Sequence, residues 1–207
     1  MGIVAHQPRR VIANADDVTL VHELTTRHPG LPATWVGQGH EWHLEPDGDE
    51  SWLCRGEDKL FHTGSSRMLG RHNHQNMLMA LALADATGHL ELSQIEPVLS
   101  QFEGLSHRLE RIPDPSGVVF VNDSLATNPQ AGAAALRSLS SSGVVWVVGG
   151  QDRGVDYQPL VDQVLVCKPR HILGLPPPRR KLPGLFRHAL HTARSPRDLL
   201  LAGVPPL

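Results

Sequence analysis

The sequence predicts an α/β fold with a mostly parallel sheet, and three observations carry this prediction. Two short apolar runs, Val118–Val121 and Gly143–Val148, have the length of buried strands. An alanine-rich segment, Pro129–Ser138, lies between them and has the composition of a helix. A strand, a helix and a second strand in this order imply a parallel pair with a right-handed crossover. The same alternation opens the chain, where the apolar run Val11–Asn14 precedes a helix predicted from Asp17 to Thr26.

We expect two domains, because 207 residues suffice for two small units that each have a core of their own. The boundary is predicted at the segment Gly104–Glu110, which follows a helix stop and precedes the turn Pro113–Gly117. The first domain then covers residues 1–103, and the second covers residues 104–207.

The first domain changes pattern after its opening strand and helix. Residues Ala33–Thr63 form short apolar pieces around tryptophans, broken by a Pro-Asp-Gly-Asp turn, which predicts small antiparallel strands. Two helices follow. The first, Asn73–Ala86, is strongly apolar and ends at Gly88 as a C-cap, and the second, Leu92–Phe102, has Ser93 at its start.

In the second domain, the alternation of strands and helices continues beyond Val148. The pattern predicts a helix at Tyr157–Val166, a strand at His171–Leu175, a loop at Pro176–Pro178 and a weak helix at Arg197–Leu201. This order is typical of a Rossmann-like domain with a mostly parallel sheet.

Composition and charge argue against several classes of protein. The formal net charge of -2 provides no basic field for nucleic acid. No stretch approaches the roughly 20 apolar residues of a membrane span, so we expect a soluble, cytoplasmic protein. Cys54 and Cys167 lie far apart and have no C-x-x-C partner, which argues against a disulfide framework and a zinc ribbon.

Polar clusters follow the predicted strands of the second domain, where open α/β sheets bind their ligands. Asn122–Ser124 offers a carboxylate that suits ribose hydroxyls. Thr127–Pro129 leads into a helix whose amino-terminal N–H groups favour an anion. Gly149–Gly154 contains Arg153, which can grip a carboxylate or a phosphate in bidentate fashion. From spacing alone, a helix cap and a turn explain these residues equally well.

Several histidines raise the possibility of a metal site. His40, Glu41 and His43 lie in a tryptophan-rich segment, with His62, His72 and His74 further along the chain. Their spacing does not match H-E-x-x-H, and histidines in such strands are usually buried or solvated without a metal. We therefore predict no metal site among them.

Four strings, taken together, have a more specific meaning. They occur in the order and with the approximate spacing of the motif series of the Mur ligases, and they most resemble the branch that joins UDP-N-acetylmuramoyl-L-alanine to glutamate. The four strings are Leu69–Asn76, Gly104–Glu110, Asn122–Pro129 and Gly149–Gly154. The resemblance covers roughly residues 10–175. It implies the remainder of the family's ATP-binding central domain in residues 1–103, and a truncated glutamate-binding domain in residues 104–207.

The resemblance also implies roles for individual residues. Asn73, from the His-Asn pair, would hold adenine. Arg108 and Asp123 would reach the base and the ribose of ATP from the second domain. Thr127 and Arg153 would bind the carboxylate of the incoming glutamate. Elementary chemistry agrees, because an Asn side chain can pair with the donor and acceptor edge of adenine and a carboxylate can accept from two hydroxyls.

The chain departs from the family's pattern in several places. Arg153 stands where members commonly have Lys, so a planar fork replaces a point charge, and Leu125 stands where some have Lys. No G-x-x-x-x-G-K string is present to cradle phosphates. The family's magnesium ligands belong upstream of Met1, and its closing serine-rich loop has no counterpart here. We therefore expect ATP and Mg²⁺ as cofactors of the complete enzyme, with the metal ligands outside this chain.

Two functional hypotheses follow. In the first, the chain is a fragment of an ATP-dependent ligase that acts on ATP, glutamate and UDP-N-acetylmuramoyl-L-alanine in peptidoglycan biosynthesis, and it is inactive alone. In the second, it is a non-catalytic remnant or an interaction module that keeps the fold. The first hypothesis is favoured for the ancestry of the chain, because the chain retains Asn73, Arg108, Asp123 and Thr127. The missing phosphate loop favours the second for the isolated polypeptide.

Overall fold

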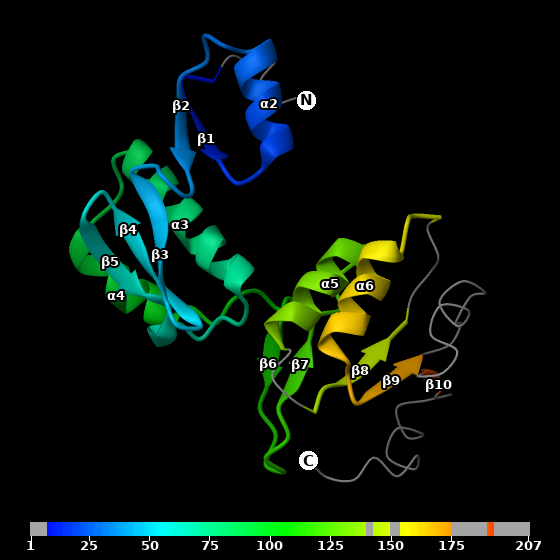
Figure 1. The fold of residues 1–207 in the computed structure, drawn as a ribbon. Helices are drawn as coiled ribbons and strands as arrows, with labels where there is room; N and C mark the ends of the chain where they lie inside the picture. The colour runs from blue at the N-terminus through cyan, green and yellow to red at the C-terminus, as the bar shows by residue number, and fades with distance from the viewer. Residues whose placement is uncertain (1–7, 140–142, 150–153, 175–189, 193–207) are drawn as a thin grey trace. The chain divides into compact units, whose positions relative to one another are not determined.

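The computed structural model describes residues 8–139, 143–149, 154–174 and 190–192, and these form strands and helices of an α/β fold (Figure 1). The chain divides into two compact units, Met1–Gly104 and Leu105–Leu207. The division falls one residue beyond the boundary predicted from the sequence. The assignment of the two parts to particular ligase domains stays a prediction.

The first unit contains a five-stranded sheet in the order β1-β2-β3-β4-β5. Its strands are β1 (Val11–Asn14), β2 (Ala33–Val36), β3 (Trp42–Asp47), β4 (Glu50–Arg55) and β5 (Asp58–His62). Pairing is parallel between β1, β2 and β3 and antiparallel from β3 to β5. The prediction of antiparallel strands throughout Ala33–Thr63 is therefore wrong for β2. This strand returns parallel to β1 because a helix connects the two.

The helices of the first unit are α2 (Val18–Arg27), α3 (Arg71–Ala86) and α4 (Leu92–Gln101), with one 3-10 turn, η1 (Thr63–Ser65). The Asp17 side chain caps α2 by accepting a hydrogen bond from the Leu20 amide at 3.0 Å. The end of α3 depends on Gly88, whose φ of 73° is in the left-handed region. The next amide, that of His89, donates to the Ala84 carbonyl at 2.8 Å and closes the helix end.

The start of α4 differs from the sequence prediction. The helix begins at Leu92 after Glu91, which makes no side-chain capping bond, so Ser93 is not the cap but the second helical residue. Ile95 and Leu99 are the buried residues of α4. Their burial indicates that packing, rather than a cap, positions this helix.

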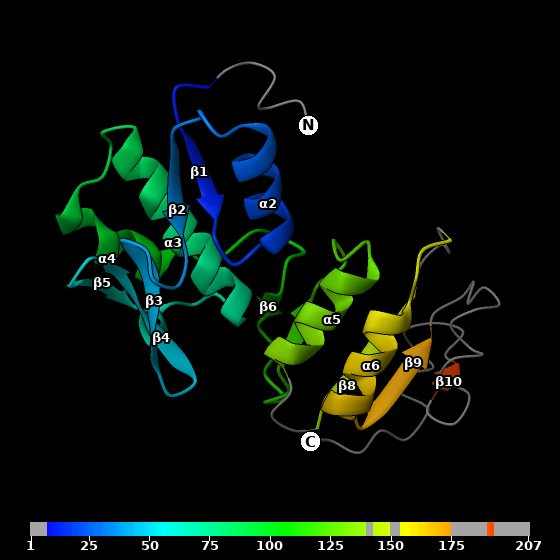
Figure 2. The ribbon, with the colours of Figure 1, turned by 45° about the horizontal axis from the view of Figure 1, so that its top comes forward.

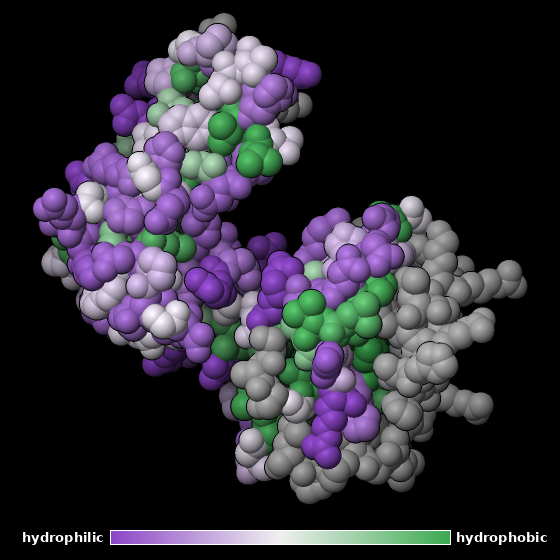
Figure 3. Space-filling model, viewed as in Figure 1, coloured by the Kyte–Doolittle hydropathy of each residue, from purple (hydrophilic) through white to green (hydrophobic). Residues whose placement is uncertain are grey.

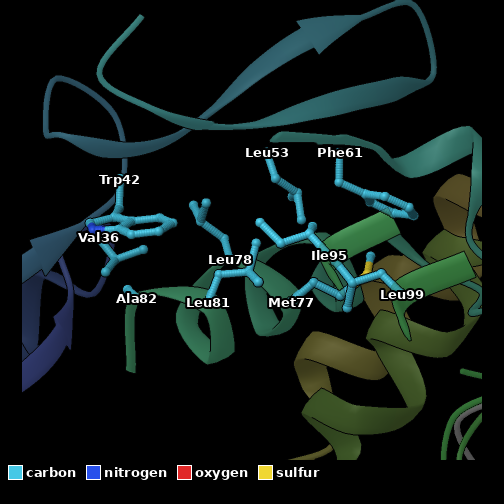
Figure 4. Packing of buried hydrophobic residues seen from close by; sticks show 10 residues of the cluster. All are labelled: Val36, Trp42, Leu53, Phe61, Met77, Leu78, Leu81, Ala82, Ile95 and Leu99. Carbon is cyan, nitrogen blue, oxygen red and sulfur yellow. The ribbon is translucent and has the colours of Figure 1, made fainter. Parts of the chain in front are cut away.

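One hydrophobic core holds the first unit together. Figure 4 shows side chains of α3 pointing toward those of β4, β5 and α4. Its buried members are Val36, Trp42, Leu53, Phe61, Met77, Leu78, Leu81, Ala82, Ile95 and Leu99. Leu53 and Leu78 have no exposed surface. Burial of each such side chain is worth about 1.5–3 kcal/mol, which fixes α3 on the sheet and with it the segment that precedes the helix.

The second unit contains two sheets and two helices. A hairpin pairs β6 (Glu110–Ile112) with β7 (Phe120–Asn122), and a parallel sheet has the order β10-β9-β8. The strands of the parallel sheet are β8 (Val145–Val148), β9 (His171–Gly174) and β10 (Leu190–Thr192). The helices are α5 (Pro129–Ser138) and α6 (Gln158–Cys167).

The position of β7 corrects a sequence prediction. Val118–Val121 was expected to be a buried strand parallel to Gly143–Val148, but β7 pairs antiparallel with β6, and Phe120 is 49% exposed. Only residues 113–119 separate β6 from β7, so the two strands pair locally as a hairpin. In the described part of the second unit, β8, α6 and β9 form a parallel crossover instead.

In the second unit, α5 and α6 lie side by side in both ribbon views (Figures 1 and 2), and they share a core with β8 and β9. Its buried members are Ala133, Leu136, Leu160, Val164 and Ile172. The helices approach closely at Gly132, where an added Cβ would lie 3.3 Å from Cδ1 of Leu160. Figure 3 shows hydrophobic residues on the surface over these helices, and Val166 of α6 is 75% exposed.

Some predictions fall on parts of the chain outside the described residues. These are Arg153, the loop Pro176–Pro178, the weak helix Arg197–Leu201 and the last residue of the predicted strand, Leu175. Within the described residues, no helix is long and apolar enough to cross a membrane.

Candidate functional site

Asn73 lies in the first turn of α3 and is half-buried. Its Nδ2 donates a hydrogen bond to the Leu69 carbonyl at 2.6 Å, and its Oδ1 accepts one from Nδ2 of Asn76 at 3.1 Å. These bonds fix the plane of the Asn73 amide. One N–H and one lone pair of that amide stay available, and they are the donor and acceptor that an adenine edge requires.

Asn76 is a polar residue of this site that the sequence analysis missed. It is exposed one helical turn after Asn73, so the two amides lie on the same side of α3. The i, i+3 spacing of two asparagines at a helix start is the signal that could have identified it.

In the second unit, the strings Gly104–Glu110 and Asn122–Pro129 come together at the end of the β6–β7 hairpin. The Leu109 amide donates to Oδ1 of Asp123 at 3.1 Å, and the Leu125 amide donates to the His107 carbonyl at 3.1 Å. A third bond joins Nδ2 of Asn122 to Nδ1 of His107 at 2.7 Å. The pairing of β6 with β7 therefore makes one site of two motifs that are separate in the sequence.

Arg108 is held between two residues with unusual backbone conformations. His107 has a φ of 65° and Leu109 a φ of 45°, both in the left-handed region that non-glycine residues rarely adopt. Leu109 is buried at 6% exposure, whereas Arg108 is exposed. Within the described part of the chain, no ion pair or side-chain hydrogen bond involves Arg108. The loop geometry therefore presents its guanidinium to solvent, where a ligand can reach it.

Asp123 is half-buried beside Arg108 in this loop. One carboxylate oxygen accepts the Leu109 amide, which fixes the orientation of the carboxylate. The other oxygen remains able to accept hydroxyl donors. Leu125, at the position where some family members have Lys, is 50% exposed near the same loop.

Thr127 is exposed directly before α5. The next residue, Asn128, caps this helix by accepting from the Ala131 amide at 2.8 Å, and Pro129 has no amide hydrogen. Fewer amides are therefore open to an anion than the sequence analysis supposed. The first turn of α5 contains no acidic residue, so the helix dipole still favours a carboxylate near Thr127.

The structure unites Arg108, Asp123 and Thr127 on neighbouring segments of the second unit, while Asn73 belongs to the first unit. Convergence of Asn73 with the other residues around one nucleoside stays a prediction. Gly149 follows β8 as expected, and Arg153 lies outside the described residues.

The histidines of the first unit are placed beside acidic residues. Nε2 of His62 lies 3.3 Å from Asp47, and Nε2 of His74 lies 3.5 Å from Glu50. Burial lowers the pKa of His74, and the charge of Glu50 acts in the opposite direction. Among the described residues, no group of three or more His, Cys, Asp or Glu side chains is arranged to hold a metal ion.

Comparisons with known proteins place this geometry in a family context. No protein-family model matches the chain. The UDP-N-acetylmuramoyl-L-alanine--L-glutamate ligase of a Micromonospora species is 36% identical over 180 residues, which are 85% of this chain and 39% of that enzyme. The UDP-N-acetylmuramoylalanine--D-glutamate ligase of Hahella chejuensis is 37% identical over 163 residues, 75% of this chain and 36% of that enzyme. The chain thus spans less than half the length of these relatives.

Solved structures share the fold. MurF from Acinetobacter baumannii superimposes with a TM-score of 0.69 at 21% identity, over 94% of this chain and 45% of that chain. MurF ligase from Thermotoga maritima, solved in complex with ADP, also gives a TM-score of 0.69, at 14% identity, over 99% of this chain and 50% of that chain. The level of identity to the curated relatives and the shared fold agree with the four motifs, and the chain belongs to the Mur ligase family, alongside its glutamate-adding members.

Proposed function

We propose that this chain forms part of an ATP-dependent ligase that joins glutamate to UDP-N-acetylmuramoyl-L-alanine in peptidoglycan biosynthesis. The relatives are named as ligases of UDP-N-acetylmuramoyl-L-alanine and L-glutamate, and the chain covers 39% of their length. The observation that supports the proposal best is the joined loop of the second unit, by which we mean Gly104–Glu110 together with Asn122–Pro129. There the Leu109 amide donates to Oδ1 of Asp123 at 3.1 Å, and Arg108, the residue before Leu109, is exposed.

In this proposal the second unit binds the ribose and the base of ATP. The free oxygen of Asp123 accepts the ribose hydroxyls, and the guanidinium of Arg108 lies against the base or donates to it. Asn73 of the first unit recognises adenine through the free donor and acceptor of its amide. Each residue holds and orients the nucleotide, and none of them takes part in bond making.

The acceptor amino acid binds, in this proposal, at the start of α5. The hydroxyl of Thr127 donates to the glutamate carboxylate, and Arg153 supplies a charged pair of N–H donors. The family implies Mg²⁺, but the described residues do not fit a magnesium site, since they offer no cluster of acidic ligands. We therefore assign no step to the ion within this chain. The proposal includes a cytoplasmic location, as expected from the sequence, because ATP is used there.

Nucleotide binding tests the proposal directly. We expect ADP, titrated into the ¹⁵N-labelled chain, to shift the amide resonances of Leu109 and Asp123 with millimolar affinity, which is about -4 kcal/mol. Asp123→Ala should weaken binding about tenfold, or about 1.4 kcal/mol, because the ribose loses its acceptor. Asp114→Ala, which changes an exposed carboxylate in the hairpin turn, is the matched control.

Absence of shifts in the joined loop at about 10 mM ADP, roughly -2.7 kcal/mol, would contradict the proposal. That result would favour the alternative raised by the sequence, a non-catalytic module that retains the fold. The same titration with D- and L-glutamate, followed at Thr127, would show which enantiomer the start of α5 prefers. The relatives include enzymes named for each enantiomer.

A further inference from the structure

The buried polar residues of the described chain form one connected group in the first unit. These residues are Ser51, Thr63 and His74, each no more than 5% exposed. The Ser51 amide donates to Oγ1 of Thr63 at 2.9 Å, and that hydroxyl donates to Oε2 of Glu50 at 2.6 Å. Nε2 of His74 lies 3.5 Å from the same Glu50 oxygen. The group therefore links α3 to β4 and η1.

His74 is located where it can influence the candidate adenine residue, because it follows Asn73 directly in the first turn of α3. This helix start has weak support of its own. Its N-cap is Gly70, with a φ of 95° and no side-chain capping bond, and its first turn contains Arg71 and no acidic residue. The side chains of His74 and Gln75 instead connect this turn to the sheet. His74 contacts Glu50 of β4, and Gln75 donates to Asn14 of β1 at 3.3 Å.

Of these two ties, only His74 can change its charge near neutral pH. Its Nε2 lies 3.5 Å from Oε2 of Glu50, while Nδ1 is buried and has no hydrogen-bond partner within the described residues. Burial is the main cause of the lowered pKa of His74. The positive groups Arg71, His72 and His62 lower this pKa further, and Glu50 raises it. Protonation would place an N–H with no acceptor in the core at Nδ1, which is costly.

We propose that His74 is a positioning residue for Asn73, and that its contact with Glu50 holds the first turn of α3 in the orientation that binds adenine. Only the identity of the ligand rests on the proposed function. The consequence is that protonation of His74 loosens this turn and weakens nucleotide binding. The orientation of Asn73 thus depends on the state of its neighbour.

The experiment uses the full chain, ¹⁵N-labelled, with ADP as the probe. Two variants divide the role of His74. His74→Gln keeps an N–H donor for Glu50 but cannot titrate, and His74→Leu keeps the apolar bulk but removes the donor. His89→Gln removes an exposed histidine just beyond the other end of α3 and is the matched control.

We expect the Asn73 side-chain amide resonances of the unmodified chain to move with the same midpoint as the His74 ring. The dissociation constant for ADP should rise as the pH falls through that midpoint. His74→Gln should abolish both pH responses and bind as the unmodified chain does at about pH 7.5, well above the ordinary histidine value. His74→Leu should raise the dissociation constant about tenfold at that pH. His89→Gln should behave as the unmodified chain does.

A pH response of Asn73 that persists in His74→Gln would overturn the inference. Unchanged Asn73 resonances and unchanged ADP affinity in His74→Leu would also overturn it. If His74→Leu does not fold, the comparison with His74→Gln still decides. If the unmodified chain does not bind ADP, the proposed function fails, while the response of Asn73 to the titration of His74 still supports or overturns the positioning role.

Discussion

Hydrogen bonds to backbone groups and to other side chains decide which side chains of the motifs remain available to a ligand. Asn122 is bonded to His107, and one oxygen of Asp123 is bonded to the Leu109 amide. Arg108, which lies between His107 and Leu109 in the chain, is exposed. The Asn73 side chain donates one hydrogen bond to the Leu69 carbonyl and accepts one from the Asn76 side chain. The residues that resemble those of the ligases thus use some of their hydrogen-bonding groups within the chain. Their remaining donors and acceptors are held in fixed directions.

One residue-scale prediction concerns the stability of the first unit at acidic pH. The pKa of His74 is lowered in the folded chain from the ordinary value of 6.5, so below pH 6.5 the unfolded chain binds more protons. The free energy of unfolding should therefore fall as pH drops below about 6.5, and level off below the folded pKa. Urea unfolding at a series of pH values measures this. His74→Gln should reduce the slope and His89→Gln should preserve it; equal slopes in both variants would refute the assignment.

At the scale of single elements, local signals set several helix boundaries. Asp17 begins α2, Asn128 and Pro129 begin α5, and Gly88 ends α3, each through a bond or a φ angle that neighbouring residues determine. Helix α4, like α3 and α6, starts without a side-chain capping bond, and it also contains Pro97. Its position depends on burial against the core, which a local pattern does not show.

The cap of α2 provides a prediction at this scale. Asp17→Ala should lower the free energy of unfolding by about 0.5–2 kcal/mol, because the Leu20 amide loses its acceptor. Asp16→Ala removes the same charge from the adjacent exposed residue and serves as the control. Thermal unfolding of both variants tests the cap, and similar losses in the two would show that charge rather than capping matters.

At the scale of the whole molecule, each of the two units has its own hydrophobic core. The unit boundary follows Gly104, whose φ of 92° suits a change of chain direction. Asn73 belongs to one unit and the joined loop to the other. Nucleotide binding through both would need the two units to act together.

The 207-residue chain on its own should not catalyse the complete reaction. We predict no phosphate release dependent on ATP, glutamate and UDP-N-acetylmuramoyl-L-alanine, because the sequence contains no G-x-x-x-x-G-K string for the phosphates. Each missing electrostatic donor can alone lower a rate roughly a hundredfold or more. A coupled phosphate assay measures this. Turnover above a sample heated to unfold the chain would refute the prediction, as would micromolar ATP affinity, about -8 kcal/mol.

The sequence by itself determined the α/β class, the strand at Val11–Asn14, the helix at Pro129–Ser138 and the motifs of the ligase family. Each of these depends on residues close together in the chain: apolar runs, caps, prolines and short strings. Only the tertiary structure decided that β7 pairs with β6, that the Leu109 amide orients Asp123, and that His74 contacts Glu50. These contacts join residues that are distant in sequence, and a polar residue shows no sign of its partner until the chain has folded.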